Sequence, residues 1–317
     1  MEMTTLGKTG IQVSRLCIGC WQASGWATSD DERFVDTVRH ALDLGLNFLD
    51  TAVGYGGGHS ESLVGKAIKG RRDTVVIASK LRPNKSAPAA VREELDESLK
   101  RLGTDYIDLY QQHWPPKDIP LTVTIGALEE LKQEGKIRAI GVSNWMEPEW
   151  QEFDDPSRID SLQPNHSLLW RSVEKNVLDL CRKHNIAVIP YSSLCQGILA
   201  GKFDSPEDAP KDSRQSNCRL QPGEFEKVKA VLDVLNEVAA SYGKTMAQTA
   251  LRWLLDQDGI TAPIVGASRP DQVDRNLGAL DWHLDPADWQ RLSEASWDLS
   301  ANLEPHDTMW GWHPRES

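Results

Sequence analysis

Residues 49–61 read Leu49-Asp50-Thr51-Ala52-Val53-Gly54-Tyr55-Gly56-Gly57-Gly58-His59-Ser60-Glu61. The apolar run over residues 46–49 predicts a β-strand that ends at Asp50. A glycine-rich loop follows and carries a single tyrosine, Tyr55. An aspartate after a strand is usually a turn or cap residue, and a loop tyrosine usually has no chemical role. The pair becomes informative only because other predicted strands deliver polar side chains to the same edge.

Short apolar strands alternate with amphipathic helices along most of the chain. After an N-terminal β-hairpin (3–6 and 11–13), the predicted strands are 16–18, 47–50, 74–79, 107–111, 137–142, 161–163, 187–191 and 264–265. The predicted helices are 31–44, 61–69, 87–102, 121–134, 173–184 and 246–256, with extra C-terminal helices at 224–242 and 286–295. This alternation predicts an α/β fold with a parallel sheet covered on both faces. Eight strands are the number that closes into a (β/α)8 TIM barrel.

An open doubly wound sheet is the alternative fold. It is expected to carry a Gly-x-Gly-x-x-Gly turn after an early strand, but His59 occupies the position of the third glycine. The chain of 317 residues is therefore interpreted as one barrel domain, residues 1–317. Residues 203–222, rich in Pro, Asp, Ser and Lys, predict a long loop after the seventh strand.

Composition excludes several classes of function. The net charge of −12 argues against nucleic-acid partners and against anionic membrane surfaces. The N-terminus lacks a signal peptide and no apolar run is long enough to span a bilayer, so we expect a cytoplasmic protein. Five scattered cysteines fit reduced thiols. Cys17 and Cys20 form a CxxC that ends a strand instead of beginning a helix, which disfavours redox chemistry, and no metal site is predicted.

Polar side chains gather at the ends of three consecutive predicted strands. Asp50 and Tyr55 follow the second strand, Lys80 ends the third, and His113 ends the fourth. In a barrel these positions converge on one face. Together an acid, a phenol, an ammonium and an imidazole would support carbonyl reduction, in which an incoming hydride leaves an alkoxide that must be protonated.

Each of the four side chains has an expected role. Tyr55 is the candidate general acid, although a free phenol has a pKa of about 10. A nearby Lys80 ammonium is expected to lower that pKa, and Asp50 is expected to keep Lys80 charged despite burial. His113 is expected to donate a hydrogen bond to the carbonyl oxygen and to orient it.

These residues give the chain a resemblance to the aldo-keto reductases, closest to the branch that includes the voltage-gated potassium channel β-subunits. The resemblance rests on residues 49–61, Ser79-Lys80 and Gln112-His113-Trp114, and its catalytic tetrad corresponds to Asp50, Tyr55, Lys80 and His113. It implies a bound nicotinamide cofactor, with Ser143, Asn144 and Gln163 on the carboxamide and Tyr191 stacked on the nicotinamide. The matching cofactor block over residues 190–197 adds Ser192, Leu194 and Gly197.

The last cofactor block covers residues 266–276. Ser268 as helix N-cap and Pro270 in the first turn would present amide donors to a phosphate. Arg269 beside them suits a 2′-phosphate and favours NADPH/NADP+ over NADH. The resemblance adds Gly266, and it places Gln272 and Asn276 on the adenosine. Two residues depart from the family pattern: Arg275 replaces an acid, and His166 replaces an aromatic residue, which predicts an atypical pocket.

Tryptophan is abundant, with twelve in the chain. Trp21, Trp26, Trp114 and Trp145 follow predicted strands and are interpreted as a pocket wall for apolar or aromatic carbonyls. In the C-terminal tail, Trp310 or Trp312 is expected to pack over the mouth near Trp21 and Trp114, because exposed indoles favour apolar surfaces.

Two functions remain open from the sequence. The first is an NADPH-dependent reductase of small-molecule aldehydes or ketones. The second is a regulatory or assembly subunit that binds NADP(H) with little turnover. The natural substrate, the physiological direction, and the choice between monomer and homo-oligomer are left open.

Overall fold

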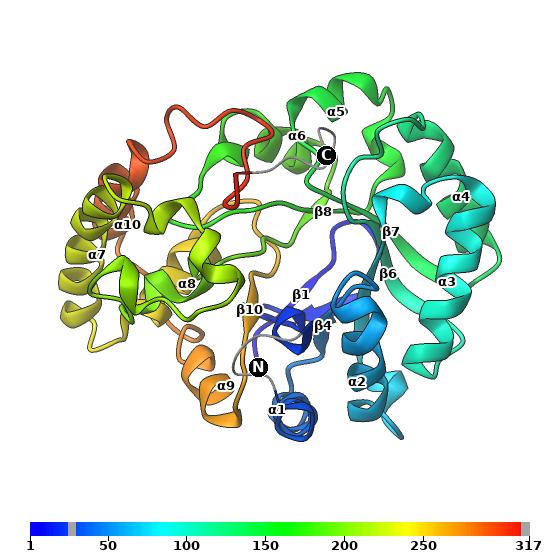
Figure 1. Cartoon of the computed structure of the whole chain (residues 1–317), viewed down its shortest axis with the longest axis horizontal. Coiled ribbons are helices and arrows are strands. Elements are labelled where there is room, and N and C mark those ends of the chain that lie inside the picture. The colour runs from blue at the N-terminus through cyan, green and yellow to red at the C-terminus, as the bar shows by residue number, and fades with distance from the viewer. Residues whose placement is uncertain (25–29, 312–317) are drawn as a thin grey trace.

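The computed structural model describes residues 1–24 and 30–311, and its centre is an eight-stranded parallel barrel (Figure 1). Its strands are β3 (Cys17–Gly19), β4 (Phe48–Asp50), β5 (Val76–Leu81), β6 (Ile107–Gln112), β7 (Ile137–Ser143), β8 (Ser161–Gln163), β9 (Ala187–Val188) and β10 (Ile264–Gly266). They pair in the order β10-β3-β4-β5-β6-β7-β8-β9. Thr261 N donates to Val188 O and Ile264 N to Pro190 O, each at 2.8 Å, and these bonds close the ring between β9 and β10. A hairpin of β1 (Met3–Thr5) and β2 (Gln12–Ser14) precedes the barrel.

Helices surround the strands, as Figure 1 shows. They are α1 (Asp31–Asp43), α2 (His59–Ala67), α3 (Pro88–Leu102), α4 (Leu121–Gln133), α5 (Glu147–Glu152), α6 (Val177–Lys183), α7 (Glu224–Ser241), α8 (Met246–Asp256), α9 (Pro270–Leu277) and α10 (Pro286–Trp297). Helix α3 illustrates how the sequence sets the start, the buried face and the end of a helix. It begins with Pro88, buries Val91 and Leu95 on one face, and ends at Gly103 in the left-handed conformation. None of the described helices is long and apolar enough to cross a bilayer.

The barrel interior changes from apolar to polar along the strands. Val76 and Ala78 on β5 belong to a buried apolar cluster inside the barrel. Because side chains alternate along a strand, the next inward position is Lys80, which is also fully buried. The carboxyl-terminal end of the barrel interior therefore holds buried charged side chains, and apolar side chains fill the interior next to them.

The predicted fold class is confirmed, and several predicted boundaries were wrong. Strand β5 lies two residues later than predicted, so Lys80 is inside the strand and not beyond it. The predicted helix over 173–184 is a short 3-10 turn, Ser172–Glu174, followed by α6. Helix α5 was not predicted, and α9 takes Arg269 as its N-cap where Ser268 was expected. The loop over 203–222 contains three short 3-10 helices.

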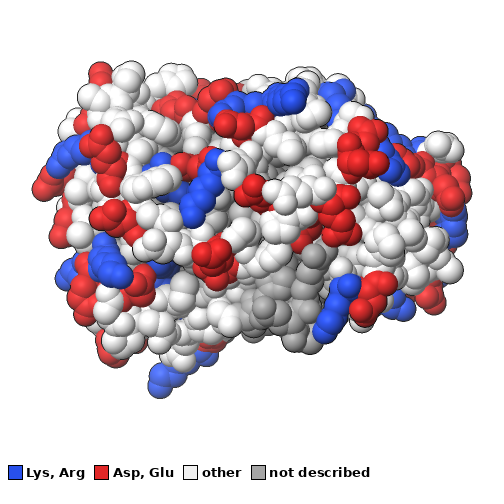
Figure 2. Space-filling model, turned by 90° about the horizontal axis from the view of Figure 1, so that it is seen from above, with Lys and Arg blue, Asp and Glu red and all other residues white. Residues whose placement is uncertain are grey.

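Charge is distributed without broad areas of one sign on the face seen in Figure 2, where acidic and basic side chains are interspersed.

After α10 the C-terminal segment, red in Figure 1, returns across the molecule toward α5 and α6. His306 Nε2 lies 3.0 Å from both carboxylate oxygens of Glu149 on α5. Cys218 N donates to Met309 O at 2.7 Å. The tail is thereby held against both sides of the barrel mouth.

Candidate active site

Asp50, Tyr55 and Lys80 form one hydrogen-bonded group at the barrel mouth. Lys80 Nζ lies 2.6 Å from Asp50 Oδ1, 2.9 Å from Thr51 O and 3.2 Å from Tyr55 OH. His113 follows β6, and its ring lies edge-on to that of Tyr55, with 5.7 Å between centroids. The structure thus brings together the four side chains that the sequence predicted as a tetrad.

The charge of Lys80 depends on its neighbours. Burial alone would lower the pKa of this ammonium, but Asp50 and Tyr55 together raise it above its ordinary value. Lys80 lowers the pKa of Tyr55 as expected, but the expected net shift of that pKa was wrong in direction. Burial raises the pKa of the phenol, and Lys80 only opposes that rise. Lys80 therefore keeps the phenolate less unfavourable than burial alone would make it, and Tyr55 is protonated at neutral pH.

His113 is neutral in this site. Burial, and secondly the charge of Lys80, lowers the pKa of its imidazole to about 3. A neutral imidazole carries a single N–H donor. The side chain can therefore donate one hydrogen bond without adding positive charge beside Lys80.

Asp50 is bonded through its second oxygen as well. Gln163 Nε2 donates to Asp50 Oδ2 at 2.7 Å, and Gln111 Nε2 lies 3.4 Å from the same atom. Gln111 was not predicted, although its position on β6 opposite β5 places it on the inward face. These amide donors hold the Asp50 carboxylate toward Lys80.

A buried glutamate ties the tyrosine loop to the strand of Lys80. Glu61 accepts hydrogen bonds from Ser79 Oγ and from Arg101 Nε, both at 2.6 Å. Glu61 was not predicted to have a role in the site. The sequence feature that could have indicated its role is a charged residue in the first turn of a helix, next to a strand whose side chains face the barrel interior. Gly58 has φ 95°, and a Cβ there would lie 2.5 Å from Arg101, so this approach requires glycine.

A cavity of about 910 Å³ opens above this group. Its wall includes three of the four tetrad residues, Asp50, Tyr55 and His113, with Lys80 behind them. Of the predicted cofactor residues it includes Ser143, Asn144, Gln163, Tyr191, Ser192, Leu194, Gly197, Gly266, Ser268, Arg269 and Gln272. Asn276 does not line the cavity and is largely buried behind Gly266. Gln272 accepts from Ser268 N at 2.7 Å, which shapes the loop before α9.

The predicted aromatic wall is correct in part. Trp21, Trp114 and Trp310 line the cavity, and the rings of Trp21 and Trp310 meet edge to face at 5.8 Å. Trp145 does not line it. Its ring is fully buried, and its Nε1 donates to Gln112 Oε1 at 2.9 Å. Asn144 before it has φ 61°, and the Trp145 ring packs edge to face against Trp150 of α5, with 5.3 Å between centroids. Trp26 and Trp312 lie outside the described residues.

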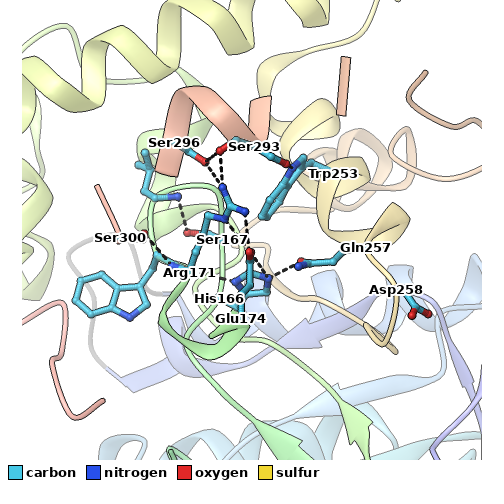
Figure 3. Close-up of polar contacts among 12 residues, drawn as sticks. His166, Ser167, Arg171, Glu174, Trp253, Gln257, Asp258, Ser293, Ser296 and Ser300 are labelled. Carbon is cyan, nitrogen blue, oxygen red and sulfur yellow. Dashed lines mark hydrogen bonds and ion pairs between the residues drawn. The ribbon is translucent and has the colours of Figure 1, made fainter. Parts of the chain in front are cut away.

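His166 does not reach the cavity, so the expected change in the pocket was wrong. Its Nδ1 lies 3.1 Å from Trp170 O and its Nε2 lies 2.6 Å from Gln257 Oε1 (Figure 3). Nearby, Arg171 pairs with Glu174 at 2.6 Å and bonds Ser293 O on α10. This departure from the family pattern belongs to a buried polar network that joins the end of β8 to α8 and α10.

Cations that the sequence analysis missed line the outer part of the cavity. They are Arg33, Lys202 and Arg214, which join the predicted Arg269. Burial, followed by the charges of Arg275, Arg269 and Arg214, lowers the pKa of Lys202. Lys202 and Arg214 belong to the loop after β9, where helix and strand periodicity gave no signal. The wall therefore has an aromatic and catalytic end and a cationic end.

The CxxC cysteines are unsuited to redox chemistry. Cys17 and Cys20 are both buried, and burial raises the pKa of each thiol. Thiolate formation is therefore disfavoured, as the sequence analysis expected from their place at the end of a strand.

The neutral state of His113 predicts a pH-dependent stability. An unfolded histidine binds its proton near pH 6.5, whereas the folded residue does so only near pH 3. Between these values the unfolded state binds more protons, so the free energy of unfolding should fall as pH drops, by up to about 1.4 kcal/mol per pH unit. His113→Gln should lose this part of the slope in urea unfolding between pH 7 and 5. His283→Gln, an exposed control, should keep it. Identical slopes for wild type and His113→Gln would contradict a buried neutral imidazole.

Comparison with known proteins identifies the family. The family model "Aldo/keto reductase family" matches residues 15–296. The aldo-keto reductase YhdN of Bacillus subtilis (strain 168) is 37% identical, covering 92% of this chain and 93% of the relative. The NADH-specific methylglyoxal reductase of Escherichia coli (strain K12) is 36% identical, covering 93% and 98%.

Solved structures agree with this assignment. The glycerol dehydrogenase AKR11B4 from Gluconobacter oxydans superimposes with a TM-score of 0.83 at 33% identity, covering 94% of this chain and 96% of that one. An aldo-keto reductase from Klebsiella pneumoniae in complex with NADPH gives 0.77 at 31% identity, covering 93% and 95%. The potassium-channel branch stays a prediction. The chain belongs to the aldo/keto reductase family.

Proposed function

We propose that the protein is an NADPH-dependent oxidoreductase that reduces aldehydes and ketones to alcohols by hydride transfer. The observation that carries this proposal is the buried Lys80 Nζ, 2.6 Å from Asp50 and 3.2 Å from Tyr55 OH, beside a cavity lined by His113. A buried ammonium bonded to a phenol is a costly arrangement for stability alone. It is useful where a phenol must give up its proton.

The cavity wall fits a nicotinamide dinucleotide. Gln196 also lines this region, and its Nε2 has no hydrogen-bond partner among the described residues. Cations at the outer end suit phosphates. We assign the carboxamide to Ser143, Asn144 and Gln163, the nicotinamide face to Tyr191, and the remaining contacts to Ser192, Leu194, Gly197, Gly266, Ser268, Arg269 and Gln272. Asn276 supports Gly266 from behind.

Bound NADPH would supply the hydride, and the chain's own residues handle the proton. Tyr55 is protonated at neutral pH and gives its proton to the carbonyl oxygen as negative charge develops there. The phenolate that remains is stabilised by Lys80, which Asp50 holds in place. The neutral imidazole of His113 donates its N–H to the same oxygen. Lys80 therefore acts on the product side of the proton transfer, where its charge is needed.

The aromatic side chains at the catalytic end favour apolar or aromatic carbonyl substrates. Trp21, Trp114 and Trp310 supply flat apolar surface, and the edge-to-face pair of Trp21 and Trp310 fixes the orientation of that wall. The cations of the wall sit at the other end, near the loop before α9.

All five cysteines are free thiols, which supports our assignment to the cytoplasm.

The role of Tyr55 is tested by Tyr55→Phe. Removing the hydroxyl removes the proton donor, so kcat for aldehyde reduction should fall by at least about 100-fold, the usual contribution of general acid catalysis. NADPH affinity should change little. Turnover close to wild type in Tyr55→Phe would eliminate Tyr55 as the acid. Wild-type protein that binds NADPH yet reduces no carbonyl in a broad panel would favour the alternative, a regulatory or assembly subunit.

Cofactor choice is tested by Arg269→Ala. Its guanidinium is half exposed, so we expect NADPH binding to weaken by about 1.5 kcal/mol, the low end for a hydrogen bond to a charged group. NADH binding should be nearly unchanged, since it lacks the 2′-phosphate. Dissociation constants from tryptophan fluorescence quenching supply the comparison. Equal losses for the two cofactors would mean that Arg269 does not read the 2′-phosphate.

The role of the tail is tested by Trp310→Ala and by deletion from Thr308 onward. Each should raise KM for bulky aromatic carbonyls roughly two- to tenfold, the range of an aromatic pair, and change KM for the smallest aldehydes less. Trp310→Ala is the cleaner variant because Met309 is fully buried. A uniform change across all substrates would leave the tail with a packing role alone.

A further inference from the structure

Asp271 in the first turn of α9 is held by two arginines at once. Arg269 Nε lies 2.9 Å from Asp271 Oδ1, and Arg269 Nη2 lies 3.4 Å from Oδ2. Arg275, one turn further along α9, pairs with Oδ2 of the same carboxylate, and its Nε donates to Asp271 O at 3.2 Å. Neither Asp271 nor Arg275 has a part in the proposed function.

The location of this triad gives it a functional consequence. Arg269 lines the cavity, whereas Asp271 and Arg275 do not. Arg275 is nevertheless close enough to act on Lys202, a cavity residue with no ion pair among the described residues. The triad therefore lies at the cationic end of the cavity, where the proposed function puts the 2′-position of the adenosine ribose.

A carboxylate at this position would favour one nucleotide over the other. An unpaired Asp271 beside Arg269 would repel the 2′-phosphate dianion of NADPH but not the uncharged 2′-hydroxyl of NADH. It would also hold the Arg269 guanidinium in an ion pair and away from the 2′-phosphate. The charge of Arg275 opposes both effects, because Arg275 shares Asp271 with Arg269 and leaves the triad with a net positive charge.

We propose that Arg275 determines nucleotide choice by sharing Asp271 with Arg269, which weakens the hold of Asp271 on Arg269 and its repulsion of the 2′-phosphate. Arg275 is a positioning residue in this proposal, since it acts through Asp271 and does not touch the nucleotide. The proposal rests on the proposed function, which requires a nucleotide with its 2′-position at Arg269.

The test is a double-mutant cycle read by calorimetry with two probes, 2′,5′-ADP and 5′-AMP, which differ only by the 2′-phosphate. The three side chains are about half exposed, so changes of roughly two- to fivefold are expected, as for exposed ion pairs. Arg275→Ala should weaken 2′,5′-ADP by this factor and leave 5′-AMP within error. Asp271→Asn should tighten 2′,5′-ADP. In the Asp271→Asn background, Arg275→Ala should have no further effect.

Arg291→Ala removes an equally exposed arginine that pairs with Glu237 away from the cavity, and it should change neither probe. The proposal is overturned if Arg275→Ala weakens 2′,5′-ADP by the same factor with and without Asp271, because that result means direct contact with the phosphate. It is also overturned if both probes weaken together.

Failure of the proposed function looks different. It appears as wild-type protein that binds 2′,5′-ADP no more tightly than 5′-AMP. A preference for 2′,5′-ADP that then emerges in Asp271→Asn would still support control through Asp271. If Asp271→Asn also binds 2′,5′-ADP no more tightly than 5′-AMP, the inference is overturned as well.

Discussion

A buried ammonium must find compensating charge and hydrogen bonds, and Lys80 imposes that constraint on the whole barrel mouth. Its side chain is fully buried, so the pair with Asp50 at 2.6 Å is what keeps it charged. Asp50 needs donors of its own, which Gln163 and Gln111 supply from β8 and β6. One lysine on β5 therefore determines the polar residues that β4, β6 and β8 present to the interior.

The same constraint explains the rigid surroundings of the tyrosine loop. Tyr55 must stay within reach of Lys80, although glycines flank it on both sides in the sequence. Glu61 connects this loop to β5 through Ser79 and to α3 through Arg101. Ser60 Oγ adds bonds of 2.8 Å to Thr51 Oγ1 and 2.9 Å to Cys20 O. The loop is thus fixed on three sides, which is what preorganisation of a proton donor requires.

Sequence patterns captured the elements whose signals are local. The eight strands follow from hydrophobic periodicity. The tetrad follows from the polar residues that end those strands, and the place of Trp310 follows from the apolar side chains of the tail. The sign of the pKa shift of Tyr55 did not follow, because burial outweighs the charge of Lys80 and burial is not local. Trp145 was misplaced because the left-handed turn at Asn144 redirects the chain. Lys202 and Arg214 were missed because they lie in an irregular loop.

The central claim is that Lys80 serves the proton transfer by stabilising the Tyr55 phenolate. The most direct test is kcat for carbonyl reduction as a function of pH in Lys80→Met, with NADPH affinity measured in parallel. The account predicts that kcat falls by orders of magnitude and that the alkaline limb of its pH profile moves to higher pH, because the phenol loses the charge that opposes the effect of burial. NADPH should still bind. A Lys80→Met variant with wild-type kcat and an unchanged pH profile would contradict the account.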